Sequence, residues 1–347
     1  MSRDQTAERL LDQAWGLRGA VLTRLGHGLI NATWRVDLPD GRRFAMQRVN
    51  PVFPPAVNAD IDRVTRRLAE AGLRTPRLEL TSGSDLWLER DGETWRVMTW
   101  VDGVSRDALA DPGQAQRAGE LLGAFHRALD GISGDFANPR LGVHDSARHL
   151  ATLRRALDEH RGHAEYARVA ALARDILDMA EQLPALAPTP DRVVHGDPKI
   201  NNMLFDPVTG AGRALVDLDT VGCMPLPLEL GDALRSWCNP AGENRRSGVF
   251  SPELFAGALR GYFGATQEWI TLDEQRAILP ATLTIIVELA ARFCADALNE
   301  SYFGWDSEQY PTRSEHNQVR AAGQLALARS CADQYAALDA VVATLLV

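Results

Sequence analysis

The spacing of apolar and polar positions changes once along the chain. Over residues 19–50 it is close to two, in VLTRLGHGLINATWRVDL and then in GRRFAMQRVN, which predicts three strands with a tight bend at Gly26 and Gly28. Residues 56–72 have the period of an amphipathic helix. Two more strand-like runs follow, DLWLER and TWRVMTWV. The first part of the chain is therefore predicted to be rich in strands.

Beyond residue 103 the apolar period is near 3.6, in AQRAGELLGAFHRALDG, ARHLATLRRALDEH and YARVAALARDILDMAEQL. One short strand-rich interruption, DRVVHGDPKINNMLFDPVTGAGRALVDLD, precedes further helices. We therefore predict an α+β protein with a small strand-rich lobe, residues 1–100, and a large helical lobe, residues 101–347. The joint is expected near residues 98–103.

Composition excludes several classes of protein. A formal net charge of −9 argues against nucleic acid or an anionic membrane as the main partner. Four scattered cysteines without CxxC spacing argue against a zinc site or a disulfide framework, so a cytoplasmic location is expected. The most apolar segment, residues 281–299, is interrupted by charged residues, so no membrane span is predicted. The oligomeric state is left open.

The candidate chemistry lies in HGDPKINN, residues 195–202, between two apolar runs. A second apolar run, ALVDLD, brings Asp217 and Asp219 from downstream. A carboxylate and an amide carbonyl, completed by phosphate oxygens and water, are what Mg²⁺ prefers, which makes Asn202 and Asp217 candidate metal ligands. Asp197 then remains to orient and deprotonate a hydroxyl. Phosphoryl transfer needs this set, because its catalysis is mostly positioning and charge neutralisation.

Lys199 is the only lysine among 37 lysine and arginine residues. A compact ammonium can approach the transferring phosphoryl oxygens in a way that the larger planar guanidinium cannot, which explains why one lysine is kept. The structural alternative is that HGD forms a plain turn in which Asp197 caps backbone amides, and that VDLD is an exposed strand end.

The spacing H-x-D-x-K-x-x-N, followed 15 residues later by an apolar strand that ends in Asp, resembles the catalytic loop and metal segment of the protein-kinase-like fold. HGDPKINN with ALVDLDTVG closely resembles the aminoglycoside phosphotransferase and choline kinase superfamily. GHGLINATWRV, FAMQRVNPVF, LGDALR and ELAARFCADALNESYF are similar to the N-acetylhexosamine 1-kinase group. Those enzymes phosphorylate the anomeric hydroxyl of N-acetylglucosamine or N-acetylgalactosamine.

The resemblance implies a bilobal kinase-like fold, ATP and Mg²⁺ as cofactors, and roles for individual residues. It implies a catalytic base, Asp197; a cation on the phosphoryl group, Lys199; and two metal ligands, Asn202 and Asp217. Asp219 has no counterpart in protein kinases, and we expect it to touch the metal or the sugar or to brace the loop. His195 is expected to hold the loop by hydrogen bonds.

The strand-rich lobe supplies the expected nucleotide contacts. The turn over the phosphates is predicted at Gly26, Gly28, Asn31 and Thr33, because glycine lets backbone amides approach closely, although a plain hairpin bend fits the same residues. Adenine is expected against the backbone of the connector between the lobes, at Thr99 and Val101. Trp100 in the same run is either a contact or core.

The third strand departs from the usual kinase pattern. Kinases of this fold usually carry lysine there, whereas this chain has Gln47 followed by Arg48, as in the hexosamine kinases that it resembles. Successive strand residues face opposite sides, so one of the two at most reaches the phosphates. The partner on the following helix is ambiguous between Asp60 and Asp62, and both are alternatively solvated charges.

The acceptor site is expected on the apolar run 281–299. Glu288, Arg292 and Asp296 are four residues apart and form one charged stripe, which we interpret as facing a cleft, with Arg292 and Asp296 as sugar contacts. A surface ladder of ion pairs is the alternative. His144, in LGVHDSARH, is a weaker candidate.

Three functions follow from this reading. The first is an ATP-dependent sugar 1-kinase that acts on a small-molecule sugar. The second keeps the fold and changes the acceptor to an aminoglycoside, homoserine or choline. The third is a catalytically silent nucleotide-binding regulator, which the absent third-strand lysine suggests and the HGDPKINN set opposes.

Overall fold

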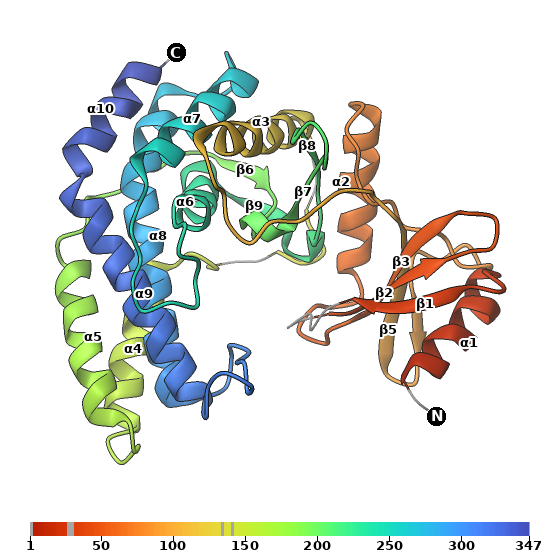
Figure 1. Cartoon of the computed structure of the whole chain (residues 1–347), viewed down its shortest axis with the longest axis horizontal. Coiled ribbons are helices and arrows are strands. Elements are labelled where there is room, and N and C mark those ends of the chain that lie inside the picture. The colour runs from red at the N-terminus through yellow and green to blue at the C-terminus, as the bar shows by residue number, and fades with distance from the viewer. Residues whose placement is uncertain (1–2, 26–30, 133–134, 140–141, 347) are drawn as a thin grey trace.

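The small lobe is built on a five-stranded antiparallel sheet. The computed structural model describes residues 3–25, 31–132, 135–139 and 142–346, and the sheet lies at one end of the molecule (Figure 1). The spatial order is β1-β2-β3-β5-β4. The strands are β1 (Val21–Leu25), β2 (Ala32–Asp37), β3 (Arg43–Val49), β4 (Leu88–Arg90) and β5 (Glu93–Thr99). All five correspond to predicted runs.

The alternation along β3 divides its side chains between two environments. Phe44 and Met46 are buried in a small core that α1 (Arg3–Trp15) covers. Gln47 points to the opposite face, where it meets Arg96 of the neighbouring strand. That face is the one turned toward the large lobe, so polar residues on it can take part in a site between the lobes.

Helix α2 (Val57–Glu70) stands between the sheet and the large lobe (Figure 1). Its apolar side, which includes Val57, Ile61 and Val64, belongs to the core of the large lobe and not to the core under α1. The boundary predicted at residue 100 therefore follows the order of the chain, whereas packing joins α2 to the helical lobe.

The large lobe is helical, as predicted. Its helices are α3 (Pro112–Ala128), α4 (Ser146–Glu159), α5 (Tyr166–Ala180), α6 (Leu226–Trp237), α7 (Pro252–Thr266), α8 (Leu272–Asn299), α9 (Arg313–Asp333) and α10 (Tyr335–Leu345). Helix α8 packs against α4, α5, α6 and α9. Among the described residues α8 alone is long and apolar enough to cross a membrane, but 89% of its apolar window is buried inside the protein, as in a core helix.

Two short strand pairs support the HGDPKINN segment. They are β6 (Asp191–Val194) with β9 (Gly222–Pro225), and β7 (Met203–Phe205) with β8 (Gly212–Leu215). The loop between β6 and β7 contains HGDPKINN, and the loop between β8 and β9 contains Asp217. Because β6 pairs with β9 and β7 pairs with β8, the two loops lie at the same ends of these strand pairs. Backbone hydrogen bonding of Val216 N–H to Asn202 O, at 2.9 Å, joins the two loops directly. The topology thus brings the two predicted catalytic segments together.

Candidate active site

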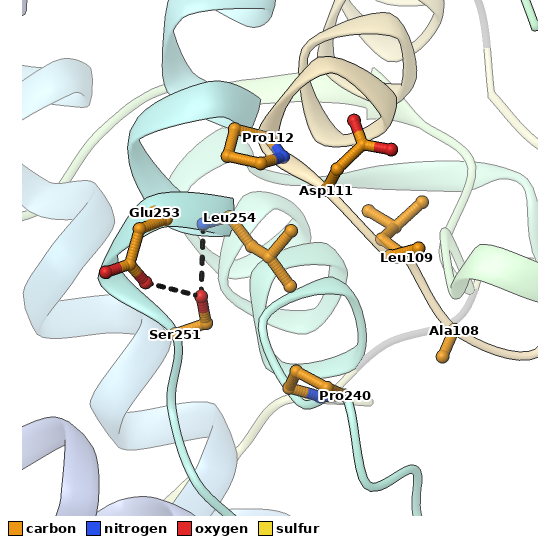
Figure 2. A pocket seen from close by; sticks show the side chains of 9 residues that line it. Ala108, Leu109, Asp111, Pro112, Pro240, Ser251, Glu253 and Leu254 are labelled. Atoms are coloured by element: carbon orange, nitrogen blue, oxygen red, sulfur yellow. Dashed lines mark hydrogen bonds between the residues drawn. The ribbon is translucent and has the colours of Figure 1, made fainter.

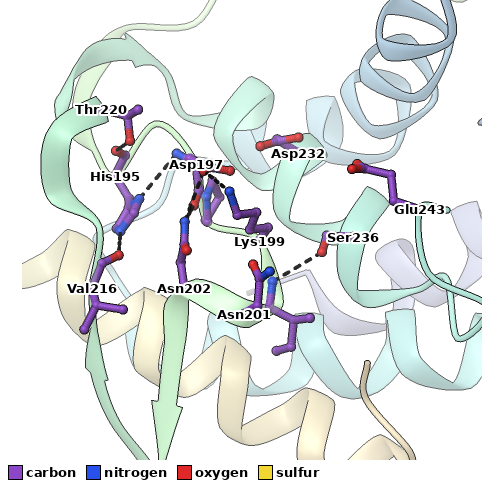
Figure 3. A network of polar contacts seen from close by, with 12 residues as sticks. His195, Asp197, Lys199, Asn201, Asn202, Val216, Thr220, Asp232, Ser236 and Glu243 are labelled. Carbon is purple, nitrogen blue, oxygen red and sulfur yellow. Dashed lines mark hydrogen bonds and ion pairs between the residues drawn. The ribbon is translucent and has the colours of Figure 1, made fainter. Parts of the chain in front are cut away.

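Asp197, Lys199 and Asn202 form one hydrogen-bonded group in the loop after β6 (Figure 3). Lys199 Nζ donates to Asp197 Oδ2 at 2.6 Å, and Asn202 Nδ2 donates to the same oxygen at 3.1 Å. Burial works against the Lys199 charge, but the Asp197 carboxylate outweighs it and raises the pKa of Lys199, so the side chain is an ammonium. The amide nitrogen of Asn202 is also held by Asp197 O at 2.9 Å. Its carbonyl oxygen, the end that binds metals, accepts no hydrogen bond from the described residues.

The backbone of this loop is fixed from behind. His195 is fully buried; its Nε2 donates to Val216 O at 3.0 Å and its Nδ1 accepts from Asp197 N–H at 3.3 Å. Burial lowers the pKa of His195, which keeps the ring neutral and fits the loop-holding role expected for it. Glu229 of α6, also fully buried, accepts the backbone N–H groups of His195 and Gly196 at 2.9 and 3.0 Å. Glu229 had no signal in the sequence beyond its place on a helix.

The backbone conformation and the close packing at position 196 require glycine after His195. Its φ is +82°, and a Cβ atom there would lie 2.1 Å from Thr220 O. Because Thr220 also donates from Oγ1 to His195 O at 2.8 Å, the close approach joins the catalytic loop to the segment that contains Asp217. A larger residue at position 196 would separate the two segments.

Asp217 has the character of a metal ligand without a protein counter-ion. It forms no ion pair with the described residues, and its backbone is left-handed, with φ +65°. Burial, then the charges of Asp219 and Asp197, raise the pKa of Asp217 to about 7. Asp217 follows Val216, whose N–H donates to Asn202 O, so a carboxyl without an ion pair and the free carbonyl of Asn202 come from two joined loops. Such oxygen donors suit a hard divalent cation, so the donor set fits Mg²⁺.

Asp219 braces the inter-lobe structure and is not free to touch a sugar or a metal. It is fully buried, and both of its oxygens accept from Arg96, at 2.6 and 2.7 Å. Burial alone would raise the pKa of Asp219, but the Arg96 charge and hydrogen bonds lower it. Of the three roles expected for Asp219, the geometry supports the bracing role. Arg96 was not among the predicted site residues.

The predicted phosphate-binding residues of the small lobe divide into three groups. Gly26 and Gly28 lie outside the described residues. Asn31 is buried and donates from Nδ2 to Asp219 Oδ2 at 2.7 Å. Thr33 Oγ1 accepts from Gln47 Nε2 at 3.1 Å, so both are committed to the sheet surface.

Of the two third-strand candidates, only Gln47 faces the large lobe. Its Oε1 accepts from Arg96 Nε at 2.8 Å. Arg48 points to the other side of the sheet and pairs with Glu93 at 2.5 Å, so the interpretation of Arg48 as a phosphate contact is not supported. The strand alternation that left the choice open thus assigns the two side chains to different faces.

Neither acidic candidate on α2 is the partner of the third strand. Asp60 is buried and accepts the backbone N–H groups of Ala137 and Asn138 at 2.9 and 3.0 Å, so it holds a loop of the large lobe. Asp62 pairs with Arg66. The α2 residue that meets the sheet is Asn58, whose Oδ1 accepts from Arg96 Nη1 at 3.2 Å.

The two predicted adenine contacts in the connector between the lobes differ in their backbone hydrogen bonds. Thr99 N–H donates to Arg77 O at 2.8 Å, so this donor is already used. Val101 has no backbone hydrogen bond to the described residues. Trp100 Nε1 donates to Asp102 Oδ1 at 3.1 Å and its ring is only half-buried, so Trp100 is not core. Val101 is the better placed of the two predicted adenine contacts.

A charged group that sequence reasoning missed lies beside Lys199. Asp232 of α6 and Glu243 of the following loop lie on the same side of the catalytic loop as Lys199 (Figure 3). Arg235 donates to Asp232 at 2.9 Å and to Glu243 at 2.7 Å. Burial works against ionisation of Asp232, but Arg235 and then His144 and Arg292 interact with it and lower its pKa. The i, i+3 spacing of Asp232 and Arg235 was the one available signal.

His144 and Arg292 meet at a buried carboxylate. Glu288 is 1% exposed and accepts from Ser146 Oγ at 2.7 Å and from His144 Nδ1 at 3.0 Å. Arg292 Nη1 lies 3.7 Å from the same carboxylate, and its side chain keeps 19% exposure. Both His144 and Arg292 also lower the pKa of Asp232, so the two candidates lie near the charged group beside Lys199.

Asp296 accepts hydrogen bonds from the turn that follows its own helix, α8. Its oxygens accept the backbone N–H groups of Ser301, Tyr302 and Phe303 at 2.9 Å each, and Nδ2 of Asn317 at 2.9 Å. The side chain is 4% exposed. The expectation that Asp296 contacts the sugar is therefore not supported, because its acceptor capacity is spent on the turn after α8.

A separate pocket of about 500 Å³ lies where the first turns of α3 and α7 face the loop after α6 (Figure 2). Its lining contains none of the predicted site residues. The polar groups there cap helices: Asp111 accepts from Gln114 N–H and Ser251 from Leu254 N–H. No set of converging catalytic groups is present among the described lining residues.

The comparisons with known proteins agree with this geometry. In fold the chain resembles a microcompartment-associated aminopropanol kinase (TM-score 0.63, 14% identity, covering 97% of this chain and 99% of that one). It also resembles an amicoumacin kinase solved with AMP-PNP and Ca²⁺ (0.62, 11%, 92% and 93%). A choline/ethanolamine kinase family protein from Mesorhizobium loti is similar as well (0.55, 18%, 98% and 99%).

These likenesses confirm the predicted bilobal kinase-like α+β fold. The sequence itself matches a phosphotransferase family over residues 21–272, a span that contains the sheet, the HGDPKINN loop and Asp217. The chain is accordingly an enzyme that transfers a phosphoryl group to a small molecule. The chain belongs to the phosphotransferase enzyme family.

Proposed function

We propose that this enzyme transfers the γ-phosphoryl group of ATP to the anomeric hydroxyl of an N-acetylhexosamine. The observation that carries the transfer chemistry is the group formed by Asp197, Lys199 and Asn202, with the unpaired Asp217 on the adjoining loop. A silent regulator would have no need to keep these four side chains together.

Each residue has a distinct task in this proposal. Asp197 accepts the proton of the attacking hydroxyl. Lys199 leaves Asp197 when nucleotide binds and donates to the transferring phosphoryl oxygens. Asn202 and Asp217 hold Mg²⁺, which supplies charge neutralisation when bound. The backbone of Val101 receives the adenine.

The charge balance around the loop favours a neutral acceptor. Other carboxylates near the catalytic loop already have an arginine neighbour: Asp232 and Glu243 share Arg235, and Arg292 lies near Glu288. The solved neighbours are named for amicoumacin, aminopropanol and choline or ethanolamine, and a cationic acceptor of that kind needs a free carboxylate. Asp217 is a carboxylate without an ion pair to the described residues, but this proposal assigns it to the metal.

The acetamido sugar is supported by two further features. The segments GHGLINATWRV and ELAARFCADALNESYF are similar to the hexosamine kinases. In addition, the guanidinium carbon of Arg292 lies over the ring of Tyr302, 6.0 Å from its centroid, and Tyr302 is 63% exposed, so a planar donor and an exposed aromatic ring are close together. Such a pair suits a neutral ring with hydroxyl and amide acceptors.

A panel of acceptors tests the proposal. Purified enzyme with ATP and Mg²⁺ is offered N-acetylglucosamine, N-acetylgalactosamine, glucose, kanamycin, choline, ethanolamine, aminopropanol and homoserine. We expect the highest kcat/KM with an N-acetylhexosamine, and ³¹P–¹H coupling to the anomeric proton of the product. A higher kcat/KM with any of the cationic acceptors would overturn the sugar assignment while leaving the phosphotransferase chemistry intact.

A further inference from the structure

One guanidinium links both lobes at the centre of the molecule. Arg96 of β5 is 1% exposed. Its Nε donates to Gln47 of β3, its Nη1 to Asn58 of α2, and both Nη atoms to Asp219 in the turn before β9. Arg96 therefore touches the sheet, the helix between the lobes and the metal-binding segment at once.

Asp219 extends this contact to the nucleotide turn. Its Oδ2 also accepts from Asn31 Nδ2 at 2.7 Å, and Asn31 Oδ1 accepts from Asn50 N–H at 2.8 Å. Asn31 directly follows the glycine-containing stretch 26–30 in the chain. The position of Asp219 thus depends on two segments of the small lobe, although it lies in the large lobe.

Stability alone does not explain a buried pair of this kind. Replacing a buried ion pair by apolar residues of similar volume is often neutral or stabilising, because the pair must first lose its hydration. What the pair provides is geometry: a bidentate fork fixes both distance and orientation. One residue separates Asp219 from Asp217, whose left-handed backbone requires the surrounding structure to hold it.

We propose that Arg96 is the positioning residue of the phosphoryl transfer site. By clamping Asp219 it fixes Asp217, and through Gln47 and Asn58 it sets the sheet and α2 against that segment. Four of its N–H donor positions are engaged by protein, so it acts through Asp217 and not by contact with the phosphates. The inference rests on the phosphotransferase chemistry and is independent of the acceptor.

A double replacement separates positioning from stability. The variants are Arg96→Met, Asp219→Leu and the two combined, and the readouts are the melting temperature and the Mg²⁺ concentration that gives half-maximal AMP-PNP binding. We expect each single variant to melt at a lower temperature and the double variant to regain most of the loss. The Mg²⁺ requirement should rise by about tenfold or more in all three and should not recover, since a displacement of about 1 Å at such a site can cost a factor of about 100.

Recovery of both the melting temperature and the Mg²⁺ requirement in the double variant would overturn the proposal, because the pair would then be structural only. Arg96→Lys provides a second test that does not depend on repacking: it keeps the charge and loses the fork. Its melting temperature should fall because buried acceptors lose donors, and its Mg²⁺ requirement should rise; a parental Mg²⁺ requirement would contradict the proposal.

The matched control is another bidentate pair. Arg192 donates to Glu274 at 2.8 and 3.0 Å, and Glu274 is fully buried, but the pair joins β6 to α8 and touches none of the site residues. Arg192→Lys should leave the Mg²⁺ requirement unchanged. An equal rise in this variant would show a general loosening and would also overturn the proposal. Because AMP-PNP binding requires no acceptor, failure of the sugar assignment does not affect this test.

Discussion

Lys199 Nζ and Asn202 Nδ2 donate to the same oxygen of Asp197, at 2.6 and 3.1 Å. The second oxygen, Oδ1, accepts no hydrogen bond from the described residues. One half of the carboxylate is therefore fixed by the protein, and the other half is available to accept a proton from a hydroxyl. The two donors differ in how they are held: Asn202 Nδ2 is also bound to the backbone O of Asp197, whereas Lys199 Nζ has Asp197 Oδ2 as its one hydrogen-bond partner among the described residues.

Asp197→Asn should abolish most of the turnover and leave folding intact. The amide keeps the shape of the side chain and can still accept from Lys199, but it cannot take up the proton of the acceptor. We expect kcat to fall by roughly 10²- to 10⁴-fold, with AMP-PNP affinity and melting temperature close to those of the parent. Turnover near the parental level would contradict the assignment of Asp197 as the base.

Lys199→Arg should lower kcat more than it weakens nucleotide binding, although it conserves charge. A guanidinium next to Asp197 can form a bidentate pair that is difficult to displace, and its planar fork does not fit the position of an ammonium. Loss of one such donor to the transition state costs on the order of 10²-fold in kcat.

The control for Lys199 is Arg329→Lys. Arg329 forms an exposed pair with Asp175 at 2.9 Å, far from the site in the chain and outside every contact described for it. This exchange should leave kcat and melting temperature unchanged. If Lys199→Arg were equally silent in steady-state kinetics, the single lysine would be incidental.

The contacts that the sequence could predict are local ones. One loop contains Asp197, Lys199 and Asn202, so their spacing in the sequence is enough to predict that their side chains can be in contact. Arg96 is one of many arginines on alternating strands, and its partner Asp219 lies 123 residues away, so no local pattern connects them.

Local spacing also gave a wrong interpretation where the chain folds back on itself. The i, i+4 spacing of Glu288, Arg292 and Asp296 correctly indicates one helical face, but it cannot show what that face meets. The turn at 301–303 returns to Asp296 and occupies it. Local spacing also left Asp60 and Asp62 as equal candidates for the partner of the third strand, because the loop at 137–138 that Asp60 holds is distant in sequence.

Asp217→Asn should stabilise the metal-free protein at pH 8. Burial and neighbouring carboxylates raise the pKa of Asp217 from 3.8 to about 7, so the folded state keeps a proton that the unfolded state loses. Stability of the metal-free parent therefore falls as pH rises from about 4 to about 7 and stays low above that. The amide removes this cost, which we expect to be on the order of 1–2 kcal/mol after allowance for partial solvent screening.

Thermal melts in chelator between pH 4.5 and 8.5 measure this difference. The variant should melt a few degrees above the parent at pH 8, and the gap should close toward pH 4.5. Adding Mg²⁺ and AMP-PNP should stabilise the parent and have little effect on the variant. Chelator should abolish transfer by the parent. A variant that melts below the metal-free parent at pH 8 would show that Asp217 is not an unpaired carboxylate.

Arg292→Ala tests the acceptor site. Arg292 lies near Glu288 and over the rings of Tyr302 and Phe303, and its partial exposure leaves donors for a ligand. If it binds hydroxyl or N-acetyl oxygens of the sugar, its loss should cost roughly 1–3 kcal/mol, about ten- to hundredfold in kcat/KM for N-acetylhexosamine. The KM for ATP should stay nearly unchanged, because the nucleotide side of the site is not altered.

Asp296→Asn is the matched control for Arg292, from the next turn of the same helix. Asp296 accepts three backbone N–H groups and the amide of Asn317, so its replacement should lower the melting temperature through a weakened turn after α8. It should leave the KM for the sugar near the parental value, since no acceptor capacity of Asp296 is free for a ligand. The two variants thus separate binding from folding on one helix: Arg292→Ala should change the sugar kinetics, and Asp296→Asn should lower the melting temperature without changing them. Unchanged sugar kinetics in Arg292→Ala would move Arg292 to the structural residues and remove the main structural support for a hexosamine acceptor.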